Sequence, residues 1–321
     1  MKAFVIPDIH LKPWIIDKAE DIIKKGEYDK IVFLGDFVDD WHQEGNIALY
    51  DETFERLQRF IENYPDSHVT WGNHDMSYLW WERESGYSDA ARDTAVKWIT
   101  KLEYEHRDMF SFVYRVDNVI FSHAGITRDM VACYNKKKVD LDRMISSLNI
   151  GDRSRMWKEY SPLWARPGRF DFYPKDYLQI AGHTPVRRPV LYQKNNLLVV
   201  DTFSTYRDGR PVGNEKFVWV DTETKEFGVA GSSDENDIRI QMSAPGDPAY
   251  KTGDHVAVCI TDGRGEKSIK NGEVYVVDAY GTIDQDEEPS YDIMVDDGTE
   301  KCLYKHIPES EICTGLENDE D

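Results

Sequence analysis

The sequence predicts a layered α/β domain followed by a small all-β module. In the first two-thirds of its 321 residues, strand-like runs alternate with helix-like segments, a pattern typical of sheets covered by helices. Beyond residue 253, short strand-like runs alternate with turns such as Asp297-Gly298. At about 150 residues per domain, the length also corresponds to roughly two domains.

The first three predicted strands each end in a group of polar residues. Residues 2–7 lead into Asp8-Ile9-His10, residues 30–34 into Gly35-Asp36, and residues 68–71 into Gly72-Asn73-His74-Asp75. Helices are predicted between them at 14–25 and 47–64, because apolar side chains recur there at helical spacing and Pro65 stops the second. We therefore expect a strand–helix–strand alternation at the start of the chain.

The later elements of the first domain are shorter. Between residues 88 and 161 the pattern is mainly helical, interrupted by a hairpin predicted at 110–114 and 119–122. Strand-like runs then follow at residues 177–181, 190–193, 197–201, 217–221 and 226–230.

The domain boundaries follow from changes in composition. Residues 1–232 form the predicted α/β domain, and the Gly-, Ser- and Pro-containing stretch at 233–253 is predicted to be a linker. Residues 254–313 form the β module, for which an SH3-like barrel is one candidate architecture. Residues 314–321 end in five consecutive Glu, Asn and Asp residues, and we expect a disordered acidic tail there.

The net charge argues against two classes of partner. The chain carries 39 basic and 60 acidic residues, a net charge of −21, and such a chain repels nucleic-acid backbones and anionic lipid. Residues 245–321 hold 20 of the acidic residues and only 6 basic ones. The acidity is concentrated in the β module and tail, for which a protein partner is one expected role.

Nothing in the sequence points to export or membrane insertion. The N-terminus lacks the apolar core of a signal peptide, and no apolar stretch approaches the roughly 18 residues of a membrane span. The four cysteines form no CxxC pair; they are Cys133, Cys259, Cys302 and Cys313. We expect a cytoplasmic protein with reduced thiols and no membrane association.

Five groups of residues have the composition of a metal site. Three of them are the groups at the strand ends, and the second of these continues to Asp39 as Gly35-Asp36-x-x-Asp39. The other two contain histidine and follow later in the chain: Ser122-His123-Ala124-Gly125 and Gly182-His183-Thr184-Pro185. Because ligands bind beyond the carboxyl ends of strands in open α/β sheets, these loops should converge. Asp, Asn and His suit Mn, Fe or Zn, and a carboxylate such as Asp36 could bridge two ions. Taken singly, each residue could equally be a turn former or a buried, hydrogen-bonded core residue.

In this order, the five blocks resemble those of the calcineurin-like metallophosphoesterases, and most closely the branch of serine/threonine protein phosphatases and symmetrical diadenosine tetraphosphatases. The resemblance covers roughly residues 1–230 and implies a two-metal centre in a β-sandwich flanked by helices. It implies that Asp36 bridges two metals, with Asp8 and His10 on the first. The second metal would be bound by Asn73, His123 and His183.

The resemblance also assigns the proton donor. His74, held by Asp39, would protonate the leaving oxygen; the alternative is that His74 only orients Asp39. Thr184 stands where many metallophosphodiesterases have a second histidine ligand. The absence of that histidine is a feature of the phosphatase branch.

One position departs from that branch. Its protein phosphatases usually have Arg after the second Asp of the GDxxD block, where this chain has Asp40, whose carboxylate would repel a phosphate dianion. Arg166, in a Trp-x-Arg segment at 164–166 like that of bacterial phosphatases of the group, is the candidate phosphate clamp because a planar guanidinium fits phosphate oxygens. Stacking on Trp164 is the alternative role. Further candidates are Arg155, Arg169 and Arg187.

The expected function is a phosphatase that hydrolyses phosphomonoesters by attack of a metal-bridging hydroxide. The expected substrate is a protein phosphorylated on Ser or Thr, with Tyr as an alternative. A dinucleoside polyphosphate (diadenosine tetraphosphate) hydrolase is the second hypothesis, and a non-catalytic binding scaffold is the third. The expected cofactors are two divalent ions, with Mn²⁺ first and Fe, Zn, Co or Ni as alternatives.

Overall fold

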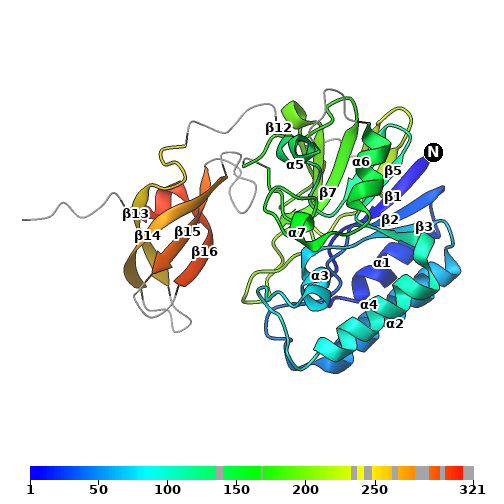
Figure 1. The fold of residues 1–321 in the computed structure, drawn as a ribbon, viewed down its shortest axis with the longest axis horizontal. Coiled ribbons are helices and arrows are strands. Elements are labelled where there is room, and N and C mark those ends of the chain that lie inside the picture. The colour runs from blue at the N-terminus through cyan, green and yellow to red at the C-terminus, as the bar shows by residue number, and fades with distance from the viewer. Residues whose placement is uncertain are drawn as a thin grey trace, which may run out of the picture. The chain divides into compact units, whose positions relative to one another are not determined.

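The computed structural model describes residues 1–134, 140–167, 169–232, 237–241, 248–261, 267–278, 289–296 and 301–313 (Figure 1). The chain divides into two compact units. The first comprises Met1–Arg166 and Phe170–Ile240, and the second comprises Gln241–Asp321 together with Pro167–Arg169. Among the described residues, no helix is both long and apolar enough to cross a membrane.

The first sheet of the first unit has six strands in the order β11-β10-β1-β2-β3-β4. Strands β1 to β4 are parallel to one another, whereas β10 and β11 are antiparallel additions at one edge. The bounds are β1 (Lys2–Ile6), β2 (Lys30–Phe33), β3 (Ser67–Thr70), β4 (Phe110–Ser111), β10 (Val218–Asp221) and β11 (Phe227–Val229).

The second sheet also has six strands, in the order β12-β8-β9-β7-β6-β5. Its centre, β6, β7 and β9, is parallel, and β5 and β8 are antiparallel to their partners. The bounds are β5 (Val113–Val116), β6 (Val119–Ser122), β7 (Leu178–Pro185), β8 (Val190–Tyr192), β9 (Leu197–Asp201) and β12 (Arg239–Gln241).

The two sheets pack face to face. Val5 and Val32 of the first sheet share a buried cluster with Phe121 and Ile180 of the second. This arrangement is a β-sandwich, because alternate side chains of each strand point into the space between the sheets. The parallel strands are buried on both faces, which explains why they appear in the sequence as nearly continuous apolar runs.

Helices cover the other face of the first sheet. Helices α1, α2 and α4 lie together beside β1 to β3 (Figure 1), and their apolar sides share one cluster with Phe4 and Phe33. Burial of a side chain such as Leu57, which is fully buried, contributes roughly 1.5–3 kcal/mol. The helices are α1 (Trp14–Ile23), α2 (Ile47–Asn63), α3 (Asn73–Trp80), α4 (Arg92–Glu105), α5 (Arg128–Cys133), α6 (Leu141–Leu148) and α7 (Arg153–Met156).

The expected hairpin is placed wrongly by a few residues. Residues 110–111 pair with β3 in the first sheet, and β6 pairs instead with Val113–Val116 in the second. The chain passes between the sheets at Phe112, where the Asn149 side chain accepts from the N–H groups of Phe112 and Val113 at 3.1 and 2.9 Å. This remote side chain stabilises the crossing, so no local signal marks it.

The predicted linker contains a strand. In β12, the Arg239 N–H donates to the Pro189 carbonyl at 2.8 Å, beside β8. Residues 233–236 and 242–247 of that linker, and the predicted acidic tail at 314–321, lie outside the described residues.

The second unit is an all-β module, as expected. Its sheet has the order β16-β15-β14-β13-β17 with antiparallel neighbours. Val258, Val274, Tyr291 and Ile293 form the centre of its buried cluster. The SH3-like barrel stays a prediction. The bounds are β13 (His255–Thr261), β14 (Lys267–Asp278), β15 (Ser290–Asp296), β16 (Lys301–Pro308) and β17 (Ile312–Cys313).

Candidate metal centre

The predicted ligands come from the strand ends of both sheets. Asp8 follows β1 and Asp36 follows β2, whereas His123 follows β6 and His183 lies near the end of β7. Asn73 is the first residue of α3, which is separated from β3 by Trp71 and Gly72. The sandwich therefore brings together residues that are up to 175 positions apart in the sequence.

The backbone is strained at four residues of the polar groups that follow these strands. His10, Asp36, Asp39 and His183 have φ values of +44°, +49°, +64° and +63°. Non-glycine residues rarely adopt this left-handed region, and each instance costs about 1–3 kcal/mol. The surrounding contacts must therefore hold these loops in place.

One group of donors forms around His123. The ligand atoms of Asp36, His123 and His183 all lie within 4.8 Å of one another, and all three residues are buried. His123 Nε2 is 3.2 Å from Asp36 Oδ2 and 3.1 Å from His183 Nδ1, and 2.9 Å from Asn73 Oδ1. His123 Nδ1 donates to the Leu34 carbonyl at 2.8 Å. In the neutral ring, Nε2 then carries its lone pair toward the group.

A second group shares Asp36 with the first. The ligand atoms of Asp8, His10 and Asp36 also lie within 4.8 Å of one another. His10 Nδ1 donates to the Asp39 carbonyl at 2.8 Å, and His10 Nε2 lies 3.7 Å from Asp36 Oδ2. Backbone carbonyls orient metal-binding histidines in this way. Asp36 thus lies where one carboxylate could contact two ions.

The donor set fits divalent metal ions. Asp8 Oδ1 is buried and has no hydrogen-bond partner among the described residues. A Cβ at Gly182 would lie only 1.9 Å from that oxygen, so the space beside the carboxylate depends on a residue without a side chain. A buried carboxylate normally needs a compensating partner. A cation bound by these oxygen and nitrogen lone pairs would supply one, and the mixed set suits Mn, Fe, Co or Zn.

The charges of the two groups perturb each other. Burial raises the pKa of Asp8 well above its usual value, and Asp201 and Asp36 raise it further. Burial also raises the pKa of Asp36, but the neighbouring histidines His123 and His74 outweigh it and hold that pKa below its usual range. Burial lowers the His123 pKa, yet Asp36 and Asp8 bring it to about 9. Protons and metal ions therefore compete for the same atoms.

Asp75 connects two of the loops, a role that the sequence analysis did not assign. Its Oδ2 accepts the N–H groups of Asp36 and Gly72 at 2.8 and 3.0 Å, and its Oδ1 accepts that of Phe37 at 2.8 Å. The loop after β2 is thus tied to the start of α3. The signal was available, since Asp75 is the last residue of the Gly72–Asp75 block.

His74 is held as a proton donor would be. His74 Nδ1 donates to Asp39 Oδ2 at 2.9 Å, and Asp39 Oδ1 accepts the hydroxyls of Tyr78 and Tyr50 at 2.5 and 3.0 Å. Burial lowers the His74 pKa, but the charges of Asp36 and Asp39 bring it to about 9. The tyrosines were missed by the sequence analysis. Tyr78 lies one helical turn after His74, whereas no local pattern marks Tyr50.

The candidate phosphate clamp follows a tryptophan that contacts the donor group around His123. The Trp164 ring contacts that of His183, with centroids 5.8 Å apart. Arg166, two residues later, is half-buried, and its Nη1 has no hydrogen-bond partner among the described residues. Arg155 and Arg187 are exposed. Of these three arginines, Arg166 is the one with a buried nitrogen available for an anion, and its role stays a prediction.

Asp40 is paired in the structure, whereas its position in the sequence predicted a carboxylate that would repel phosphate. Its Oδ2 lies 3.0 Å from the Lys12 ammonium, and its Oδ1 accepts the Thr205 hydroxyl at 3.2 Å. The ammonium balances its charge, so the expected repulsion of phosphate is reduced.

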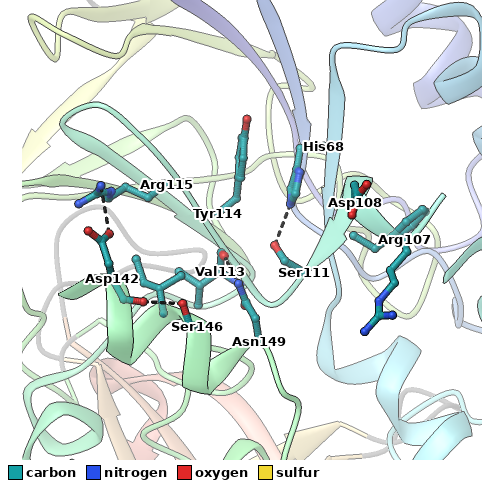
Figure 2. Close-up of a pocket in the computed structure, with 12 residues that line it drawn as sticks. His68, Arg107, Asp108, Ser111, Val113, Tyr114, Arg115, Asp142, Ser146 and Asn149 are labelled. Atoms are coloured by element: carbon teal, nitrogen blue, oxygen red, sulfur yellow. Dashed lines mark hydrogen bonds and ion pairs between the residues drawn. The ribbon is translucent and has the colours of Figure 1, made fainter. Parts of the chain in front are cut away.

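A separate cavity of about 450 Å³ lies between β4, β5 and α6 (Figure 2). Arg115 and Asp142 form an ion pair of 3.0 Å at one side of it, and His68 Nε2 lies 2.8 Å from Ser111 Oγ. His68 also stacks on Tyr114, with ring centroids 3.7 Å apart. Burial lowers the pKa of His68 to about 3. None of the predicted metal ligands lines this cavity.

Comparisons with known proteins give one family model and several similar solved structures. A family model described as calcineurin-like phosphoesterase matches residues 1–209. Similar solved structures include a cold-active protein tyrosine phosphatase of a psychrophilic Shewanella species, with 16% identity over 71% of this chain and 80% of that chain and a TM-score of 0.43. A novel archaeal phosphodiesterase shows 18% identity over 71% and 98% of the two chains, with a TM-score of 0.32.

A metallophosphoesterase from Sphaerobacter thermophilus shows 16% identity over 86% of this chain and 89% of that chain, with a TM-score of 0.30. Among curated proteins, none matches the sequence.

Proposed function

The chain belongs to the calcineurin-like phosphoesterase family, and we propose that it is a two-metal phosphomonoesterase that acts on phosphorylated proteins. The family makes it a metal-dependent phosphoester hydrolase. The observation that supports the finer proposal is the pair of donor groups that share Asp36.

In this proposal Asp8 and His10 would hold one metal ion, and Asn73, His123 and His183 would hold a second. Asp36, which belongs to both donor groups, would serve both ions. We take Mn²⁺ as the native metal. When bound, two such ions would supply a water of lowered pKa as nucleophile and stabilise negative charge on phosphoryl oxygens. No nucleophilic side chain is then needed.

The protein side chains supply the proton for the leaving oxygen. His74 Nε2 carries that proton, because Nδ1 is already bonded to Asp39. Two tyrosine hydroxyls occupy the other oxygen of Asp39, so its carboxylate cannot turn away from His74. Burial and the Asp39 charge raise the pKa of both tyrosines, which keeps them protonated as donors. The imidazole is therefore held in one orientation, with Nε2 left to donate its proton.

Substrate binding is assigned to Arg166. A guanidinium with a buried, unbonded nitrogen can form paired hydrogen bonds to two phosphoryl oxygens. The expected substrate is a phosphoserine or phosphothreonine side chain. The acidic composition of residues 245–321 favours recruitment of a protein with a basic surface.

A paired initial-rate assay tests this proposal. Mn-loaded protein is given a phosphoserine/phosphothreonine peptide in one reaction and diadenosine tetraphosphate in another, with the Asp36→Asn variant as the blank. Faster phosphate release from the peptide supports the phosphatase. Faster cleavage of the tetraphosphate would make the protein a dinucleoside polyphosphate hydrolase. Rates no higher than the blank in both reactions would contradict catalysis and favour a binding scaffold.

A further inference from the structure

Two loops carry four of the proposed functional residues and lie against each other. The loop after β1 contains Asp8 and His10, and the loop after β2 contains Asp36 and Asp39. The Asp36 carbonyl accepts the N–H groups of both Ile9 and His10, at 3.0 and 2.8 Å. Both loops contain residues at positive φ, so their conformation depends on the contacts between them.

A largely buried ion pair joins the residues that follow His10 and Asp39 in these loops. Lys12 Nζ lies 3.0 Å from Asp40 Oδ2, and the two side chains are 9% and 19% exposed. The same ammonium donates to the His10 carbonyl at 3.3 Å. Solvent-exposed ion pairs contribute little, but removing one partner of a buried pair leaves an uncompensated charge. This pair therefore constrains the loops in a way that an exposed pair does not.

The pair is one peptide unit away from the atoms that orient a ligand. Asp40 follows Asp39, whose carbonyl accepts His10 Nδ1 at 2.8 Å and whose carboxylate holds His74 at 2.9 Å. A movement of Asp40 would move both contacts. The direction of His10 Nε2, and so its approach to Asp36, depends on that carbonyl.

We propose that Lys12 and Asp40 are a positioning pair that sets the geometry of the first metal ion through the Asp39 carbonyl and His10. The inference rests on the proposed metal centre. Lys12 contacts neither donor group through a ligand atom, so it acts through His10. Asp40, at the position where the related phosphatases usually have Arg, then serves to anchor Lys12.

The test uses Mn²⁺ binding and not turnover. Wild type, Lys12→Met, Asp40→Asn, the double variant and Lys12→Arg are titrated with Mn²⁺ by calorimetry, and the electron paramagnetic resonance spectrum of the loaded protein reports whether two ions are coupled. Lys30→Met is the control for the loss of a lysine from an ion pair outside the site, because Lys30 pairs with Asp66 at 2.7 Å at the opposite end of β2 from Asp36. Thermal unfolding of each metal-free variant reports folding separately.

We expect Lys12→Met and Asp40→Asn each to weaken the binding of one Mn²⁺ by about 10- to 100-fold and to reduce the coupled signal. The double variant should lose little more Mn²⁺ affinity than either single variant. Lys12→Arg should keep most of the wild-type affinity. Lys30→Met should behave like wild type. Should Lys12→Met fail to fold, Asp40→Asn and Lys12→Arg carry the test.

Either of two results would overturn the inference. One is wild-type Mn²⁺ affinity and coupling in the folded Lys12→Met and Asp40→Asn variants. The other is an equal loss in Lys30→Met, which would indicate a general effect on stability. If the wild-type protein itself binds no pair of coupled ions, the proposed metal centre fails first, and the positioning pair with it.

Discussion

Replacing His74 by Asn should slow the hydrolysis of alkyl phosphates far more than that of aryl phosphates. The metal centre should survive the change, because the backbone N–H of His74 makes the 2.9 Å hydrogen bond to Asp36 Oδ1. An Asn amide can also donate to Asp39. The substitution therefore removes the proton at Nε2 and leaves the other contacts in place.

The magnitude follows from the role of that proton. A positioned general acid contributes about 10²- to 10⁴-fold to the rate, which corresponds to roughly 3–5 kcal/mol of activation free energy. A serine alkoxide is a poor leaving group and needs the proton fully. A 4-nitrophenolate leaves without that proton, so kcat of the variant for 4-nitrophenyl phosphate should fall by less than about tenfold.

The assay compares kcat for a phosphoserine peptide and for 4-nitrophenyl phosphate in wild type and His74→Asn, with metal content measured for both proteins. His106→Asn, at the end of α4, is the control for loss of a histidine elsewhere in the same domain. Equal losses on both substrates would refute the acid role. Loss of bound metal would show that His74 supports the metal centre instead.

Three further predictions concern metal binding and stability. Gly182→Ala should displace the Asp8 carboxylate, since the added Cβ would lie 1.9 Å from its Oδ1, and metal analysis of the purified variant should show a deficit that wild type lacks. Manganese affinity, measured by calorimetry, should fall by up to about tenfold per pH unit below pH 9, because His123, with a pKa of about 9, must lose its proton to bind metal; a flat profile from pH 8 to 6 would contradict this. For His68, the pKa of about 3 in the folded protein lies below the ordinary 6.5. Below pH 6.5 the unfolded chain therefore binds more protons than the folded one, and the free energy of unfolding decreases as the pH is lowered. By pH 5 the loss is about 2 kcal/mol, and denaturant unfolding should show a weaker pH dependence in His68→Gln; an unchanged slope would refute it.

The location of the candidate site could be predicted because it depends on which residues directly follow each strand in the sequence. Each block follows a strand, and strands whose carboxyl ends share an edge bring their following residues together. The Asp8, Asp36 and His123 groups lie together in the structure, and their role as metal ligands stays a prediction. The layered α/β fold and the all-β module also follow from periodicity, since apolar patterns of period 3.6 and 2 distinguish helices from strands.

The residues that orient the site were not predictable in the same way. Tyr50 reaches Asp39 from a different helix, and Lys12 meets Asp40 across 28 positions of sequence. Such contacts depend on how helices and loops pack, which no pattern within one segment specifies. The change of sheet at Phe112 has the same origin, because Asn149 stabilises it from 37 residues away.

The origin of the donors in both sheets has a consequence for how the protein is made. The His183 N–H donates to Asp8 Oδ2 at 2.9 Å, and the two residues are 175 positions apart. During synthesis, Asp8, His10 and Asp36 leave the ribosome long before β7 is available, and loop closure over such a distance comes late in folding. A nascent or truncated chain that ends before β7 thus has the proposed donors of one metal ion but lacks His183, a proposed donor of the second. The complete proposed centre can form only after the two sheets have docked.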